Sequence, residues 1–229
     1  MDQVGLDPGE VGAVALSHEH IDHIRAVPVL LRQTPWTFLA TEKTLAAVAA
    51  LHGIELPRSR VVVLKAGHAT DWEGVRVLPF QVPHDAEDPV AFRLEWGGFQ
   101  AAVVTDLGYP DELVADHCKS LDLLALEANH DVQMLREGSY PPALKARILS
   151  RLGHLSNEAM CDLLARVLGP RLQNVVLAHL SEQNNDPETA RGLAAAVLAG
   201  SGTDLRLASQ NEPLSILIPA SRYCFPATS

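Results

Sequence analysis

The stretch ALSHEHIDHI, residues 15–24, places three histidines, a glutamate and an aspartate within six positions, directly after an apolar run. In an extended segment alternate side chains share a face, so His18 and His20 can direct two imidazoles toward one point. Asp22 and His23 follow on the next turn and can direct their side chains toward a neighbouring point. Imidazole and carboxylate are ligands for zinc, manganese and iron, and burial without a cation would leave Asp22 poorly compensated. The spacing therefore predicts two adjacent metal sites.

The composition is typical of one sizeable globular domain. The chain has 229 residues, 47% of them hydrophobic, with 15 glycines and 15 prolines, and we expect residues 1–229 to form a single domain. No apolar run approaches the ~18 residues of a membrane span, and MDQVGLDPGE at the start lacks a signal-peptide pattern. The three cysteines form no CxxC pair, which favours a reducing compartment. These features predict a cytoplasmic protein without a membrane partner.

The net charge of the chain bears on its partners. A formal charge of −10 and a pI near 5.4 exclude a global basic field that would attract nucleic acid or an anionic membrane. A polyanionic substrate would have to be held by local features, which counts modestly against a nuclease.

Strand and helix patterns alternate along the chain. Apolar runs predict strands over 11–17, 61–64, 75–82, 90–96, 99–106, 121–129, 174–180, 205–209 and 213–218, and amphipathic patterns predict helices over 24–33, 41–53, 142–153, 157–169 and 187–200. The first half is expected to be mostly antiparallel sheet. The motif at 18–23 then lies on a turn between a strand and a helix, with Glu19 facing solvent between the two inward histidines.

Further candidate ligands recur downstream at the ends of predicted strands. His84 ends the strand FQVPHD, Asp106 ends AAVVTD, and His179 follows NVVLA, whereas His154 lies between two helices in GHLSN. Taken singly, each would more often be a surface or capping residue than a ligand. Together they form a much more specific set, because apolar strands repeatedly deliver a ligand type at the same kind of position.

The order H-x-H-x-D-H followed by His, Asp and His resembles the metallo-β-lactamase superfamily. This resemblance implies an α/β (α+β) fold, a four-layer αβ/βα sandwich with a dinuclear metal site. Within the superfamily, the segments 127–131, 140–157 and 177–185 resemble a branch of small bacterial nucleases of the WalJ/YycJ type, related to the ribonuclease Z and ribonuclease J group. Members begin with additional strands and a glycine- and serine-rich turn, whereas 17 residues precede His18 here. We therefore expect a sandwich that lacks its first N-terminal strands.

The resemblance also implies roles for individual residues. One metal would be bound by His18, His20 and His84, the other by Asp22, His23 and His179, with Asp106 bridging the two. The implied cofactors are two divalent metal ions, Zn²⁺ or Mn²⁺, which activate a shared hydroxide for attack on a phosphodiester. Asp22 is counted among the catalytic groups as well as among the ligands.

Further residues are candidates for catalysis and substrate contact. By the same resemblance, His154 matches a histidine that in the related ribonucleases lies beside the metals without ligating them, where it can contact the phosphate or protonate the leaving oxygen. Glu127 could orient it; the alternative is that His154 caps a helix. Four residues are candidates for substrate contact: Lys145, Arg147, Arg151 and Asn129. For the three cations, the alternative is an ordinary solvated helix face.

Three functional hypotheses follow. The first is a metal-dependent phosphodiester hydrolase acting on nucleic acid, a DNA exonuclease in preference to an enzyme for RNA. The second is a metallo-hydrolase of a small thioester, lactone or cyclic phosphodiester, and the third is an inactive or truncated metal-binding remnant. Substrate preference separates the first two, and metal content isolates the third. The assembly stays open between a monomer and a homodimer.

Overall fold

The computed structural model describes residues 5, 7–219, 223 and 224, which form two sheets flanked by helices. The elements run in the order β1 (Ala13–Ala15), α1 (Ile21–Ile24), α2 (Val27–Gln33), β2 (Thr37–Thr41), α3 (Glu42–His52), β3 (Val61–Leu64), β4 (Thr70–Trp72), β5 (Val75–Gln81), β6 (Val90–Trp96), β7 (Phe99–Val104), α4 (Glu112–His117), β8 (Leu123–Glu127), α5 (Val132–Glu137), α6 (Pro142–Ile148), α7 (Asn157–Val167), β9 (Asn174–Ala178), α8 (Pro187–Val197) and β10 (Asp204–Leu207). Short 3₁₀ helices cover Pro8–Glu10 and Arg58–Arg60.

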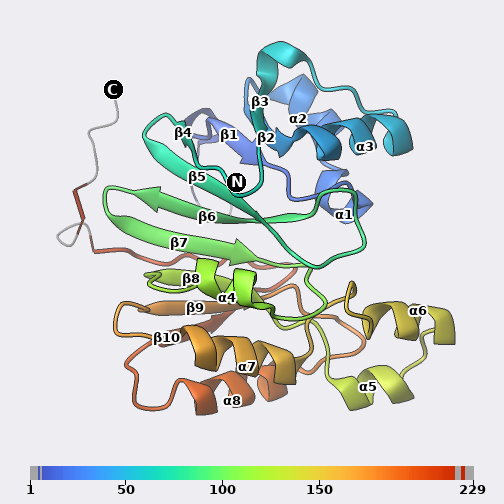
Figure 1. The fold of residues 1–229 in the computed structure, drawn as a ribbon, viewed down its shortest axis with the longest axis vertical. Coiled ribbons are helices and arrows are strands. Elements are labelled where there is room, and N and C mark those ends of the chain that lie inside the picture. Colours follow the sequence, from blue (N-terminus) through green and yellow to red (C-terminus); the bar gives the residue numbers. More distant parts are fainter. Residues whose placement is uncertain (1–4, 6, 220–222, 225–229) are drawn as a thin grey trace.

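The two sheets pack face to face between two layers of helices. The first sheet has the strand order β1-β2-β3, and the second has the order β10-β9-β8-β7-β6-β5-β4. Helices α2 and α3 cover the outer face of the first sheet, and α4, α7 and α8 cover the second (Figure 1). This arrangement confirms the predicted αβ/βα sandwich.

Alternation along β2 shows how one strand serves two layers. Phe38 and Ala40 are fully buried against the helical layer, whereas Leu39 points to the opposite face and packs between the sheets with Val77 and Phe92. Successive side chains of a strand point to opposite faces, so a strand covered on both sides is apolar throughout. Strand β2 was not predicted, and neither was the short strand β4.

The prediction of a mostly antiparallel first half is wrong for the first sheet. Strands β1, β2 and β3 pair in parallel, while β4, β5, β6 and β7 pair antiparallel. Helices α1 and α2 connect β1 to β2, and α3 connects β2 to β3. Parallel neighbours need such crossover connections, whereas the hairpin at Gly97 and Gly98 joins antiparallel strands directly.

Local sequence explains most helix boundaries. Thr41 caps α3 by accepting a hydrogen bond from the Thr44 amide, and Gly53 ends it in the left-handed region at φ 63°. Ser156 and Asp186 cap α7 and α8 in the same way. The predicted strand over 213–218 is absent, because this segment follows the edge strand β10 without pairing to it. Within the described part of the chain, no helix is long and apolar enough to cross a membrane.

Candidate metal centre

The candidate ligands meet at one edge of the sandwich because several strands end there. Strands β7, β8 and β9 are parallel neighbours, and the register pairs Glu127 with Ala178. Parallel strands deliver their carboxyl ends to the same edge, so Asp106, Glu127 and His179 come together. The motif follows β1 of the first sheet. It is joined to the second sheet where the Ser17 carbonyl accepts a hydrogen bond from the Val90 amide of β6. The site therefore draws on both sheets.

Three histidine nitrogens converge in a first cluster, formed by His18, His20 and His84. The Nδ1 atom of His20 lies 3.0 Å from His18 Nε2 and 3.2 Å from His84 Nε2. Burial, with the nearby charge of His23, lowers the pKa of His18 to about 3, and burial likewise lowers the pKa of His84. Both imidazoles are neutral at pH 7.

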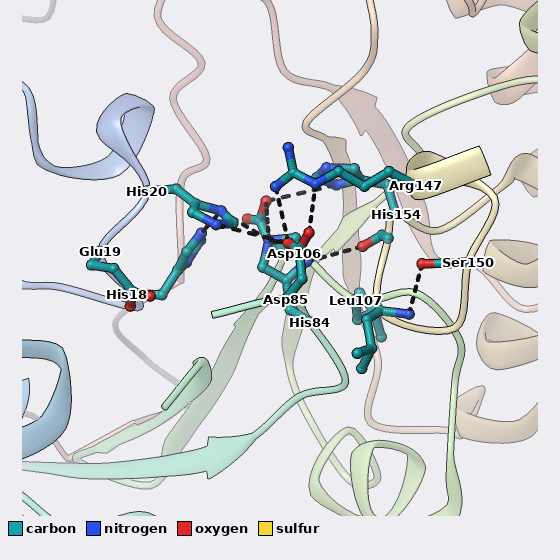
Figure 2. A network of polar contacts seen from close by, with 12 residues as sticks. His18, Glu19, His20, His84, Asp85, Asp106, Leu107, Arg147, Ser150 and His154 are labelled. Carbon is teal, nitrogen blue, oxygen red and sulfur yellow. Dashed lines mark hydrogen bonds and ion pairs between the residues drawn. The ribbon is translucent and has the colours of Figure 1, made fainter. Parts of the chain in front are cut away.

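A second cluster, formed by Asp22, His23 and His179, lies beside the first. The Nε2 atom of His23 is 3.6 Å from Asp22 Oδ2 and 3.3 Å from Asp106 Oδ2. Asp106 also faces the first cluster, with its Oδ1 atom 3.9 Å from His84 Nε2. The carboxylate predicted to bridge two metals thus lies between the two clusters, as Figure 2 shows for the side facing His84.

Neighbouring groups fix how the imidazoles are oriented. The Ser17 hydroxyl lies 3.0 Å from His18 Nδ1 and 3.1 Å from His23 Nδ1, and its oxygen can accept from both rings. His84 Nδ1 donates to the Gly153 carbonyl at 3.0 Å. With Nδ1 engaged, each of these rings presents its Nε2 lone pair to the centre. Neither Ser17 nor Gly153 was predicted from the sequence, and the position of Ser17 immediately before the motif is the signal that could have indicated it.

Glu127 orients two histidines at once. This fully buried carboxylate lies 2.8 Å from His154 Nδ1 and 2.9 Å from His179 Nδ1. Its other oxygen accepts hydrogen bonds from the amides of Leu107 and Leu155. A carboxylate can only accept, so both rings carry a proton at Nδ1 and turn Nε2 away from Glu127. Burial alone raises the pKa of Glu127, but the two histidines hold it below its usual value.

Two of the candidate ligands have strained backbones. Asp106 has φ 60° and His179 has φ 57°, in the left-handed region that residues other than glycine rarely adopt. Asp106 lies two residues after the end of β7 and His179 directly follows β9, and each costs folding free energy that the surrounding sheet must offset. Such strain is common where side-chain placement matters more than backbone stability.

The donor set fits divalent cations. The Nε2 atoms of His18 and His84 both point at His20 Nδ1 in the first cluster, and beside the second cluster the buried Asp106 Oδ2 has no hydrogen-bond partner among the described residues. A cation among these atoms would be bound by the histidine nitrogens and would compensate the unsatisfied carboxylate oxygen. Imidazole nitrogen and carboxylate oxygen suit zinc, manganese and iron.

A cleft of about 400 Å³ opens beside the second cluster. Its lining includes His154, His179, Asn129 and Arg147, so the structure brings these candidate residues together. The Asn129 side chain also donates to the His179 carbonyl at 3.0 Å, which connects it to the loop that begins at His179.

Two of the candidate substrate contacts lie away from the cleft. Lys145 donates to the Arg136 carbonyl at 2.7 Å, and the Arg151 guanidinium stacks over Tyr109 at 3.7 Å from the ring centroid. Neither residue lines the cleft. Regular helical spacing could not predict this, because α6 ends at Ile148 and Arg151 lies on the following turn.

Comparison with known proteins places the chain in a family. A model of the beta-lactamase superfamily domain matches residues 3–179. The chain belongs to this superfamily. The exodeoxyribonuclease YycJ of Bacillus anthracis is 34% identical over 200 residues, covering 87% of this chain and 75% of that protein. The exodeoxyribonuclease WalJ of Streptococcus pneumoniae serotype 2 is 35% identical over 210 residues, covering 90% of this chain and 78% of that protein.

Solved structures agree on the fold. YhfI from Bacillus subtilis, a metallo-beta-lactamase fold protein, superposes with a TM-score of 0.67 at 15% identity, covering 90% of this chain and 78% of that one. Zinc-bound PqqB from Methylobacterium extorquens also has a TM-score of 0.67, at 19% identity, covering 90% of this chain and 73% of that one. At this identity the likeness shows the beta-lactamase superfamily fold and no more.

Glu19, within the superfamily motif, does not face solvent as expected. Its side chain is buried, and Oε1 accepts a hydrogen bond from the Glu87 amide at 2.9 Å, while the buried Oε2 has no hydrogen-bond partner in the described part of the chain. The contact ties the motif to the loop that follows His84 (Figure 2 shows Glu19 beside His18). Alternation correctly placed Glu19 on the face opposite the histidines, but that face is covered by the loop.

We expect Glu19→Ala to destabilise the metal-free protein by about 1–3 kcal/mol, because the variant leaves the Glu87 amide without its acceptor. Glu19→Gln retains an acceptor and is expected to stay close to wild type. Urea unfolding of both variants in chelator measures the difference. Equal losses in the two variants would contradict the role given to this hydrogen bond.

Metal binding is expected to release a proton from His179. Burial alone lowers its pKa, but the hydrogen bond and charge of Glu127, with Asp106 and Asp22, raise that pKa from 6.5 to about 9. The metal-free protein therefore holds this proton at pH 7, and a metal must displace it. Apparent affinity should rise with pH up to about 9 and then level. Titration calorimetry in two buffers of different ionisation enthalpy measures the release at pH 7.5; buffer-independent heats there would contradict it.

Proposed function

We propose that this chain is a metal-dependent exonuclease that hydrolyses phosphodiester bonds of DNA. The observation that carries the substrate class is the 34–35% identity, over most of the chain, to two proteins named exodeoxyribonucleases. The two clusters that could hold metal ions, the second of which borders the cleft, support the same chemistry. The site draws residues from both sheets, which supports one catalytic domain that includes both.

We infer two divalent cations, zinc or manganese, from the two clusters that share Asp106. His18, His20 and His84 would hold one cation, and Asp22, His23 and His179 the other, with Asp106 between them. When bound, such a pair supplies a nucleophile at neutral pH and neutralises charge that develops on the phosphate.

The protein's own residues supply orientation and a proton. Ser17 fixes the rings of His18 and His23, and Glu127 fixes those of His179 and His154. Burial alone lowers the pKa of His154, but Glu127 raises it above its usual value, so the ring is more readily protonated near neutral pH. Lining the cleft with its Nδ1 held by Glu127, His154 would donate a proton from Nε2 to the leaving oxygen.

Activity on end-labelled substrates tests the proposal. Purified protein supplied with Mn²⁺ would be assayed on linear single- and double-stranded DNA, on closed circular DNA of the same sequence, on RNA, and on a panel of small thioesters, lactones and cyclic phosphodiesters. We expect mononucleotide release from linear DNA, none from the circles, and loss of activity with chelator. Turnover of a small ester with inert DNA would replace the proposal with a small-molecule hydrolase, and a metal-loaded protein inert on every substrate would overturn it.

A further inference from the structure

One ion pair stands at the mouth of the cleft. Arg147, near the end of α6, donates from Nε to Asp85 Oδ2 at 2.5 Å and from Nη2 to Asp85 Oδ1 at 3.1 Å. The two parallel hydrogen bonds fix the plane of the guanidinium. About half of the Arg147 side chain remains exposed, so the pair is accessible from the cleft.

The pair lies directly beside the first histidine cluster. Asp85 Oδ1 is 3.6 Å from His84 Nε2 and 3.8 Å from His20 Nε2. One carboxylate therefore separates the guanidinium from two of the candidate ligands, and Figure 2 shows the Arg147 side chain extending over Asp85. The sequence analysis missed Asp85, although it directly follows His84.

Charge at the cleft makes Arg147 distinctive. The lining contains the carboxylates of Asp22, Asp85 and Glu182, and among the described residues that line it Arg147 is the one lysine or arginine. The whole chain carries a formal charge of −10. A phosphate in the cleft therefore meets three carboxylates, and among the described lining residues Arg147 is the side chain with a permanent positive charge to offset them.

The guanidinium has donors to spare. Arginine carries five N–H donors in a fixed fork, and the contact with Asp85 uses one on Nε and one on Nη2. The Nη1 group makes no hydrogen bond with the described residues. Asp85 therefore holds one edge of the fork and leaves the other available to phosphate oxygens.

We propose that Arg147 binds a phosphate group of the substrate at the mouth of the cleft, and that Asp85 is a positioning residue that orients its guanidinium. This inference rests on the proposed nuclease function and extends it by naming the contact that holds the strand beside the centre. It concerns the phosphate, which every nucleotide shares, and therefore predicts affinity without base preference.

The test compares Arg147→Ala with Arg191→Ala, a matched control on α8 whose guanidinium pairs with Glu188 outside the cleft. We expect Arg147→Ala to raise KM for DNA on the order of tenfold or more with a smaller change in kcat, and to reduce the slope of log affinity against log salt by about 1. Arg191→Ala should stay within about twofold on both, since surface substitutions away from the site have small effects. Arg147→Lys, which keeps the charge and loses the fork, should fall between them.

Asp85→Asn separates positioning from neutralisation. If Asp85 orients the guanidinium, the variant raises KM because the fork is released. If Asp85 merely cancels the charge of Arg147, removing its charge makes the mouth more positive and lowers KM. The metal content of each variant is measured alongside, and an unchanged content shows that the substitution has not disturbed the cluster around His84.

Binding of an end-protected phosphorothioate oligonucleotide, followed by fluorescence anisotropy with the metal-loaded protein, makes the inference independent of turnover. Versions with and without a terminal phosphate distinguish an end group from an internal phosphate. If the protein does not cut DNA but binds the oligonucleotide, and Arg147→Ala weakens that binding, the proposed function is wrong and the inference is supported. Unchanged binding, KM and salt slope in Arg147→Ala, or no binding by the wild type, would overturn the inference and leave the pair as a tie between α6 and the His84 loop.

Discussion

Replacing Asp106 with alanine is expected to lower kcat on DNA on the order of 10³-fold or more and to reduce bound transition metal from about two ions per chain to about one or fewer. The carboxylate lies 3.3 Å from His23 Nε2 and 3.9 Å from His84 Nε2, so its removal affects both clusters. Burial alone raises its pKa, but His23, His179 and His18 hold that pKa well below the usual range. Asp106 therefore carries its negative charge at every working pH.

Two further variants serve as controls for Asp106→Ala. Asp106 has φ 60°, and asparagine tolerates this conformation, so Asp106→Asn removes the charge without adding backbone strain. Asp116→Ala removes an exposed carboxylate of α4 that pairs with Lys119 and should change neither metal content nor rate. Elemental analysis after chelator-free purification, with kcat and thermal unfolding, measures all three. Full metal occupancy in Asp106→Asn would contradict a bridging role.

Sequence periodicity predicted the ends of the strands better than the relations between them. Asp106 and His179 follow β7 and β9 as expected, because apolar runs bounded by polar residues mark strand ends directly. The parallel pairing of β1, β2 and β3 was missed, since strand direction depends on crossovers that a local pattern does not encode. The segment 213–218 has strand composition but no partner strand. Leu217 there is almost fully exposed.

Within the site, residue types were predictable and orientations were not. The spacing of His18, His20 and His23 indicated a metal centre before any fold was known, because few functions gather so many imidazoles. The hydroxyl of Ser17 and the carboxylate of Asp85 escaped notice, since serine and aspartate are common beside any turn. Their importance depends on distances that only the assembled sheets define.

His154→Ala is expected to retain bound metal and to lose on the order of 10²–10⁴-fold in kcat on DNA, the range for a lost general acid. Its Nδ1 atom is held by Glu127 at 2.8 Å, and the charge of Glu127 raises the pKa of His154 against the effect of burial. An acid must be protonated, so wild-type kcat should fall as pH rises through this pKa. The variant should lack that alkaline decline.

A substrate with a good leaving group separates proton donation from simple support of the loop. Bis(p-nitrophenyl) phosphate expels an anion that needs no protonation, so His154→Ala should lose far less on this substrate than on DNA. Glu127→Gln is the informative comparison, because Glu127 also orients His179 at 2.9 Å. That variant should lower metal affinity about 10–100-fold in addition to slowing DNA cleavage. If His154→Ala also loses metal, or slows both substrates equally, then His154 supports the centre and does not donate the proton.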